Sequence, residues 1–110
     1  MIVCWITDLI FASKVRATAA ELGLEVEFVR DTQAFLNKAT AAQKVVVDLR
    51  TPGVMDVLTR LRDTPTTAKI ARIGFIDHVQ GEIMTAAQKL GCVVYSKGEF
   101  SRALPQILAS

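Results

Sequence analysis

The chain has 110 residues, of which 51% are hydrophobic, and its formal net charge is +2. This length suits one domain over residues 1–110, and the apolar content excludes an intrinsically disordered protein. The nearly balanced charge gives no indication of a nucleic-acid or anionic-membrane partner, and no apolar run reaches the ~20 residues that span a bilayer. The first residues lack the basic start and cleavage site of a secretory signal, so we expect a cytoplasmic protein.

Five short apolar runs rich in β-branched residues predict β-strands, and segments of helical periodicity separate them. The runs cover residues 2–7, 24–29, 45–47, 70–76 and 93–95. The second run alternates apolar and acidic residues, which is typical of an edge strand with one face in water. The third run is continuously apolar, as expected for a central strand of a parallel sheet that is buried on both faces.

Between these runs, apolar residues recur at the spacing of one helix face, and capping residues stand near the ends. Gly23 and Gly91 occupy C-terminal positions typical of glycine, and Asp31 or Thr32 is suited to begin the second helix. We expect Ser101 to cap the last helix. Strict alternation of strands and helices with short connections predicts a parallel sheet with helices on both faces, which is a three-layer α/β/α sandwich.

Polar side chains gather where the predicted strands end, and the carboxyl ends of parallel strands form the ligand-binding edge of such a sheet. The residues at these positions are Thr7, Asp8, Asp48, Asp77, His78, Ser96 and Lys97. Asp48 directly follows the buried central run, so the sheet holds its backbone in a defined place. Carboxylates that meet at one edge form a set of oxygen ligands suited to a hard divalent cation.

Each of these residues also has a purely structural interpretation. In this interpretation Asp8 caps the first helix and has no other role. His78, the only histidine, is more typical of a surface or capping residue, and Lys97 of a solvated lysine. A small metal-dependent enzyme that uses Asp8, Asp48, Asp77 and His78 is a further alternative. The short loops disfavour this enzyme because they leave little room for a substrate pocket.

Over nearly its whole length the chain resembles the receiver (CheY-like) domains of bacterial response regulators. The resemblance lies in the order of the elements and in Val-Val-Val-Asp-Leu-Arg-Thr-Pro-Gly at 45–53. It extends to Ala-Ala-Gln-Lys-Leu-Gly at 86–91 and to Lys97 followed by Phe100. It implies a flavodoxin-like, receiver-like fold with a five-stranded parallel sheet of order 2-1-3-4-5. It also implies a non-enzymatic role in two-component signal transduction.

The resemblance further implies roles for individual residues. Asp48 matches the aspartate that accepts the phosphoryl group as a carboxylate nucleophile. Lys97 matches the lysine that pairs with this phosphoryl group. Asp8 and Asp48 would hold Mg²⁺, although Thr7 stands where the family has a second acidic residue after the first strand. The resemblance therefore implies Mg²⁺ as the one candidate cofactor, with one carboxylate fewer than usual.

The switch position departs from the family pattern, which has a serine or threonine there. This chain has Ile76 at that position, with Asp77 beside it. An isoleucine donates no hydrogen bond to a phosphoryl oxygen, and an aspartate repels it. We therefore predict a stand-alone receiver-like signalling domain that acts through protein–protein contacts, with phosphorylation lost or reduced. The alternative is a functional receiver that is phosphorylated on Asp48 with Mg²⁺.

The expected partner is a protein, either a kinase or a downstream signalling protein, and self-association into a homodimer is a second expectation. We expect that no output domain follows Ser110 and that the signal leaves through protein contact. In the family this surface commonly consists of the fourth helix, fifth strand and fifth helix. In this chain it would include Ala87, Tyr95 and Leu104.

The two cysteines, Cys4 and Cys92, lie in apolar runs and show no metal-binding spacing. A free thiol in such a run behaves as a small hydrophobic side chain, so we expect both to be reduced core residues. In the strand order that the resemblance implies, the spacing of neighbouring strands separates them by about 14 Å. A disulfide needs Cα atoms within about 7 Å, so no bond between them is expected.

Overall fold

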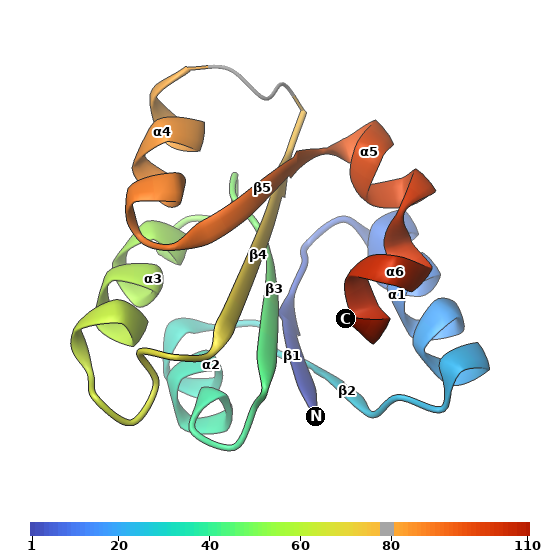
Figure 1. Cartoon of the computed structure of the whole chain (residues 1–110), viewed down its shortest axis with the longest axis horizontal. Coiled ribbons are helices and arrows are strands. Elements are labelled where there is room, and N and C mark those ends of the chain that lie inside the picture. Colours follow the sequence, from blue (N-terminus) through green and yellow to red (C-terminus); the bar gives the residue numbers. More distant parts are fainter. Residues whose placement is uncertain (78–80) are drawn as a thin grey trace.

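The computed structural model describes residues 1–77 and 81–110, and Figure 1 shows a twisted sheet between two layers of helices. The elements are β1 (Ile2–Trp5), α1 (Leu9–Leu22), β2 (Val26–Phe28), α2 (Thr32–Ala39), β3 (Lys44–Asp48), α3 (Val54–Asp63), β4 (Ala71–Ile76), α4 (Glu82–Lys89), β5 (Cys92–Ser96), α5 (Lys97–Arg102) and α6 (Leu104–Ala109). Neighbouring strands are parallel, in the order β2-β1-β3-β4-β5. The predicted α/β sandwich and strand order are confirmed.

A hydrophobic core lies on each face of the sheet. Val45 and Val46 are neighbours in β3, and their side chains point to opposite faces because a strand alternates. Val45 belongs to a buried cluster that includes Leu58 of α3, whereas Val46 belongs to one that includes Val15 of α1. Accordingly α2, α3 and α4 cover one face, and α1, α5 and α6 cover the other (Figure 1).

The central and edge strands differ in burial as their sequences predict. All five residues of β3 are buried, because β3 lies between β1 and β4 and helices cover both of its faces. The three residues of β2 are half-buried, because β2 lies at one edge of the sheet and pairs with β1. Because all five strands are parallel, their carboxyl ends point to one rim of the sheet, where Asp48 ends β3.

The beginnings of the first two helices follow the sequence prediction. Asp8 caps α1, and its carboxylate accepts hydrogen bonds from the backbone N–H groups of Ile10 and Phe11. Asp31 caps α2 in the same manner. At the other end of α1, Gly23 adopts the left-handed conformation with φ of 68°, which glycine adopts without steric cost.

The carboxyl-terminal segment differs from the prediction. The Ser96 hydroxyl accepts a hydrogen bond from the backbone N–H of Glu99 at 3.1 Å, and the Glu99 carboxylate accepts one from the backbone N–H of Ser96 at 3.1 Å. This reciprocal capping box starts α5 at Lys97, immediately after β5. The predicted cap at Ser101 is wrong, because Ser101 lies inside α5. A second helix, α6, follows with Pro105 in its first turn.

The prediction of the interaction surface is also partly wrong. Ala87 and Leu104 are 0% and 1% exposed, because they form parts of the two hydrophobic cores. Tyr95 is half-buried. The two cysteines are buried free thiols, as expected, and they lie on opposite faces of the sheet, with Cys4 in one core and Cys92 in the other. Among the described helices, none is long and apolar enough to cross a membrane.

Candidate functional site

The ammonium group of Lys97 joins two acidic residues at the carboxyl rim of the sheet. Its Nζ atom lies 3.1 Å from Oδ1 of Asp77 and 3.5 Å from Oδ2 of Asp8. Lys97 is the first residue of α5, and the capping box of that helix holds its backbone in place. We call Lys97, Asp8, Asp77 and the neighbouring Asp48 the Lys97 cluster. It brings together residues from the ends of β1, β3, β4 and β5.

The protonation states of the Lys97 cluster follow from these contacts. The hydrogen bond to Asp77 raises the pKa of Lys97 most, and the charges of Asp77, Asp8 and Asp48 raise it further against the effect of burial. The backbone hydrogen bond from Phe11 lowers the pKa of Asp8, with further lowering by the Ile10 N–H and by Lys97. Near neutral pH the cluster therefore holds a protonated lysine and an ionised Asp8.

Asp48 ends β3 and is 5% exposed. Its Oδ1 atom accepts a hydrogen bond from the backbone N–H of Arg50 at 3.0 Å. This bond turns one carboxylate oxygen towards the loop that leads into α3. Its charge acts on Lys97, although the direct ion pairs of Lys97 are with Asp8 and Asp77.

The two switch candidates lie in different environments. Ile76 is 1% exposed and packs in the core on the α2, α3 and α4 side of the sheet. Asp77 follows it at the rim, where half of its side chain is exposed and its carboxylate contacts Lys97. Ile76 also pairs with Ser96 of β5 in the sheet, which sets Asp77 beside the start of α5. Of these two residues, Asp77 is the one that reaches the cluster.

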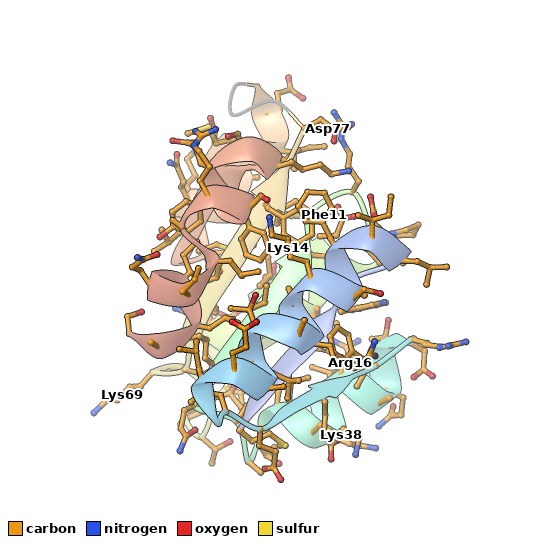
Figure 2. All side chains as sticks on the ribbon, turned by 90° about the vertical axis from the view of Figure 1, so that its right-hand side faces the viewer. Phe11, Lys14, Arg16, Lys38, Lys69 and Asp77 are labelled. Carbon is orange, nitrogen blue, oxygen red and sulfur yellow. The ribbon has the colours of Figure 1, made fainter. Side chains whose placement is uncertain are left out.

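Sequence reasoning missed an aromatic stack that supports the cluster. The Lys97 ammonium lies 5.3 Å from the centroid of the Phe11 ring, which is within the range of a cation–π contact. Phe11 stacks on Phe75 at 5.2 Å, and Phe75 stacks on Phe100 at 4.6 Å. Figure 2 shows Phe11 and Asp77 towards the same end of the molecule. In the sequence, Phe11 is indistinguishable from an ordinary residue of the buried helix stripe.

Two further candidates lie elsewhere or outside the described structure. Thr7 is exposed and lines a groove between α1 and the carboxyl end of β2, together with Ser13, Arg16, Phe28 and Arg30. We call this surface the α1–β2 groove. His78 falls between the described ranges 1–77 and 81–110. The structure therefore brings together Asp8, Asp48, Asp77 and Lys97 of the predicted set.

The oxygen donors near Lys97 do not fit Mg²⁺ well. One oxygen of Asp8 accepts two backbone N–H groups, and the other faces Lys97. The Asp77 carboxylate pairs with the same ammonium group. Within residues 1–77 and 81–110, no three acidic, histidine or cysteine side chains converge on a point where a metal ion would bind. Mg²⁺ is usually held by one or two carboxylates together with several waters, and of the three carboxylates in the Lys97 cluster Asp48 is the one that is not ion-paired with Lys97.

Comparison with other proteins gives a fold-level result. No protein-family model matches the chain, and no curated protein matches it in sequence. Several solved structures match it in three dimensions. A signal receiver domain of a two-component histidine kinase from Clostridium thermocellum superimposes with a TM-score of 0.79 at 16% identity, over 97% of this chain and 92% of that chain.

Two response regulators give similar superpositions. A receiver domain from Rhodospirillum rubrum has a TM-score of 0.77 and 21% identity, and the match covers 96% of this chain and 89% of that chain. A response regulator in red light signaling of R. palustris has a TM-score of 0.68 and 15% identity, over 96% and 89% of the two chains. The chain therefore has the fold of response regulator receiver domains.

Proposed function

We propose that residues 1–110 form a single receiver-like signalling domain that acts by binding a protein partner, with phosphorylation of Asp48 lost or much reduced. The observation that carries this proposal is the ion pair between Lys97 and Asp77, with 3.1 Å between its charged atoms. In a working receiver of this fold, the resemblance implies that a lysine pairs with the phosphoryl group and a hydroxyl donates to it. Here a carboxylate engages the lysine.

Electrostatics supports the loss of phosphorylation. A phosphoryl group on Asp48 would approach Lys97 and therefore also the carboxylate of Asp77. Two like unit charges about 4 Å apart repel by roughly 4 kcal/mol at an effective dielectric constant of 20. Ile76 offers no compensating hydrogen bond, because its side chain is apolar and packs in the core. The poor fit of the oxygen donors to Mg²⁺ removes a second source of charge screening.

One observation favours the alternative of a phosphorylated receiver. Asp48 is buried at the end of β3, and its negative charge acts on Lys97. An acceptor aspartate needs such a position close to a cation. The alternative therefore predicts transfer of a phosphoryl group from a small donor to an Asp48 carboxylate oxygen, with loss of the donor's leaving group.

The two functions are distinguished by incubating the purified chain with phosphoramidate and Mg²⁺ and then measuring its intact mass. The proposed function predicts no phosphate adduct. A hydroxylamine-sensitive adduct that is absent from Asp48→Asn would instead establish the working receiver. A matched gain-of-function variant, Asp77→Thr, removes the carboxylate and supplies a hydroxyl. We expect this variant to form the adduct, and the double variant with Asp48→Asn to form none.

Trp5 provides an independent optical signal for the same question. It is 4% exposed, packs on Phe35, and lies under the loop after Asp48, where a Cβ added at Gly53 would be 3.6 Å from its ring. Beryllofluoride, a phosphoryl mimic, should leave the fluorescence of the natural chain unchanged and alter that of Asp77→Thr. A saturable response of the natural chain would contradict the loss of phosphoryl binding.

A further inference from the structure

The α1–β2 groove is a second concave surface that the Lys97 cluster does not use. Its volume is about 480 Å³, and its floor includes the buried side chains of Ile6 and Val29. The hydroxyl groups of Thr7 and Ser13 lie along it. This combination of an apolar floor with a few polar groups is typical of a binding surface.

Two arginines give the groove its charge. Arg16 extends from α1 over the Phe28 ring, with 4.4 Å between the guanidinium carbon and the ring centroid. Arg30 follows β2, and both arginines are exposed. Among the residues that the structure describes, neither forms an ion pair, whereas nearby Lys38 pairs with Glu27. Within the described part of the chain, the groove therefore presents two arginines without a direct ion-pair partner.

The surroundings of the groove favour an extended polypeptide as its occupant. Among the described strands, β2 has β1 as its one neighbour, so the other side of its backbone faces no strand of the described sheet. An extended segment binds such an edge through main-chain hydrogen bonds. Figure 2 shows Arg16 between α1 and β2 on this side of the molecule. At the groove's end, Leu9 is 79% exposed and the adjacent Ile10 is 80% exposed, which is typical of protein-docking surfaces.

We propose that the α1–β2 groove binds an acidic, extended segment of a partner protein. The main chain of the segment pairs with the free edge of β2, and its carboxylates engage Arg16 and Arg30. An apolar side chain of the segment covers Leu9. Two arginines on a chain with a net charge of +2 favour a short acidic peptide over nucleic acid or an anionic membrane. This inference rests on the proposed function, because it names the surface that a protein partner contacts.

The test uses an eight-residue peptide of alternating glutamate and valine, with blocked ends, added to the ¹⁵N-labelled full chain. We expect saturable shifts of backbone amide signals in residues 26–30 and in the first two turns of α1. The affinity should fall as salt rises, because exposed ion pairs are screened. A peptide of alternating lysine and valine is the matched control and should cause no such shifts.

Variants assign the binding to the arginines. The double variant Arg16→Gln with Arg30→Gln keeps polar side chains but removes both positive charges, and it should weaken peptide binding at least about tenfold. Arg60→Gln, an exposed position of α3 on the other side of the sheet, should change it less than about twofold. Shifts spread over the whole molecule, or equal binding of the lysine peptide, would overturn the proposal. So would a preference for anionic vesicles or single-stranded DNA.

Failure of this inference is separable from failure of the proposed function. The peptide titration uses the unphosphorylated protein and involves neither Asp48 nor Lys97. A phosphate adduct on Asp48 would refute the loss of phosphorylation and leave the peptide result unchanged. Absence of peptide binding up to millimolar concentration would refute the groove as an acidic-peptide site, whatever the phosphorylation experiment shows.

Discussion

The ammonium group of Lys44, at the amino end of β3, lies 2.6 Å from the backbone carbonyl oxygen of Ile107 in α6. The same group donates to the carbonyl of Leu108 at 3.2 Å and to the backbone oxygen of Ser110 at 2.8 Å. Lys44 is 6% exposed. The cation therefore satisfies carbonyl groups at the end of α6, where a helix leaves its last carbonyls unpaired and its dipole is negative.

Replacement of Lys44 should accordingly loosen the end of α6. Lys44→Met keeps an unbranched side chain of similar size but removes the ammonium group, which leaves buried carbonyls without a donor. We expect the free energy of unfolding to fall by roughly 2 kcal/mol, since hydrogen bonds to charged groups contribute about 1.5–3 kcal/mol. Urea denaturation followed by circular dichroism measures this change. Lys69→Met, at an exposed position, is the control, and a similar loss there would contradict the role of Lys44.

Asp8 provides a test that depends on pH. Its folded-state pKa is lowered, so its contribution to stability is fully present above its ordinary pKa of about 3.9 and is lost as the pH falls through the folded value. At pH 7, Asp8→Ala should lower the free energy of unfolding by about 1 kcal/mol through loss of the helix cap. Denaturant titrations of both proteins between pH 7 and pH 2 should show this difference shrinking below pH 4.

A second substitution separates the two roles of Asp8. Asparagine is also a good helix cap, but it carries no charge to pair with Lys97. Asp8→Asn should therefore retain most of the stability at pH 7 and should show a weaker dependence on acid. If Asp8→Asn were as unstable as Asp8→Ala, the ion pair with Lys97 rather than the cap would be the main contribution.

The fold could be predicted because burial follows from residue pattern at particular strands. The continuous valines before Asp48 require helices on both faces, whereas the alternating acids of residues 24–29 permit an edge strand. The same topology predicted one cluster at the rim, since the residues concerned all stand where strands leave the sheet. These residues are Asp8, Asp48, Asp77 and Lys97. Which carboxylates pair with Lys97 depends on side-chain distances, which strand order does not determine.

Other features escaped prediction for local reasons. Ser96 and Glu99 form a capping box whose spacing is visible in the sequence, but Ser96 also stands at the end of a predicted strand, which hides the start of the helix. The helix therefore starts five residues earlier than a cap at Ser101 would give. The family resemblance implies a surface position for Ala87 and Leu104, whereas their apolar side chains face the two cores. The burial of Lys44 depends on where α6 ends, which only the tertiary structure reveals.

The two thiols should be unreactive in the folded protein. Burial raises the pKa of both Cys4 and Cys92 to about 12, and reaction with thiol reagents requires the thiolate. Treatment with Ellman's reagent at pH 8 should therefore modify neither cysteine on the timescale of minutes. In denaturant without reductant, two free thiols should react at once. Rapid modification of the native protein would contradict the burial of these side chains.

Gly74 tests how tightly the sheet packs against its surroundings. A Cβ added there would lie 2.8 Å from Cδ2 of Leu49 and 3.0 Å from Sγ of Cys92, closer than van der Waals contact allows. Gly74→Ala should therefore destabilise the protein by about 1–3 kcal/mol through overpacking. Gly98→Ala is the matched control, because its nearest neighbour is the flexible side chain of Arg102 at 3.3 Å.

Gly98 lies in the first turn of α5, where alanine is the better helix former, so Gly98→Ala should be neutral or stabilising by up to about 1 kcal/mol. Denaturation midpoints of the two variants should thus move in opposite directions from the natural chain, or one should fall while the other stays. If Gly74→Ala were as stable as the natural chain, the backbone of Gly74 would have to move to accommodate the methyl group. In that case β4 would be less firmly packed against Leu49 than the distances require.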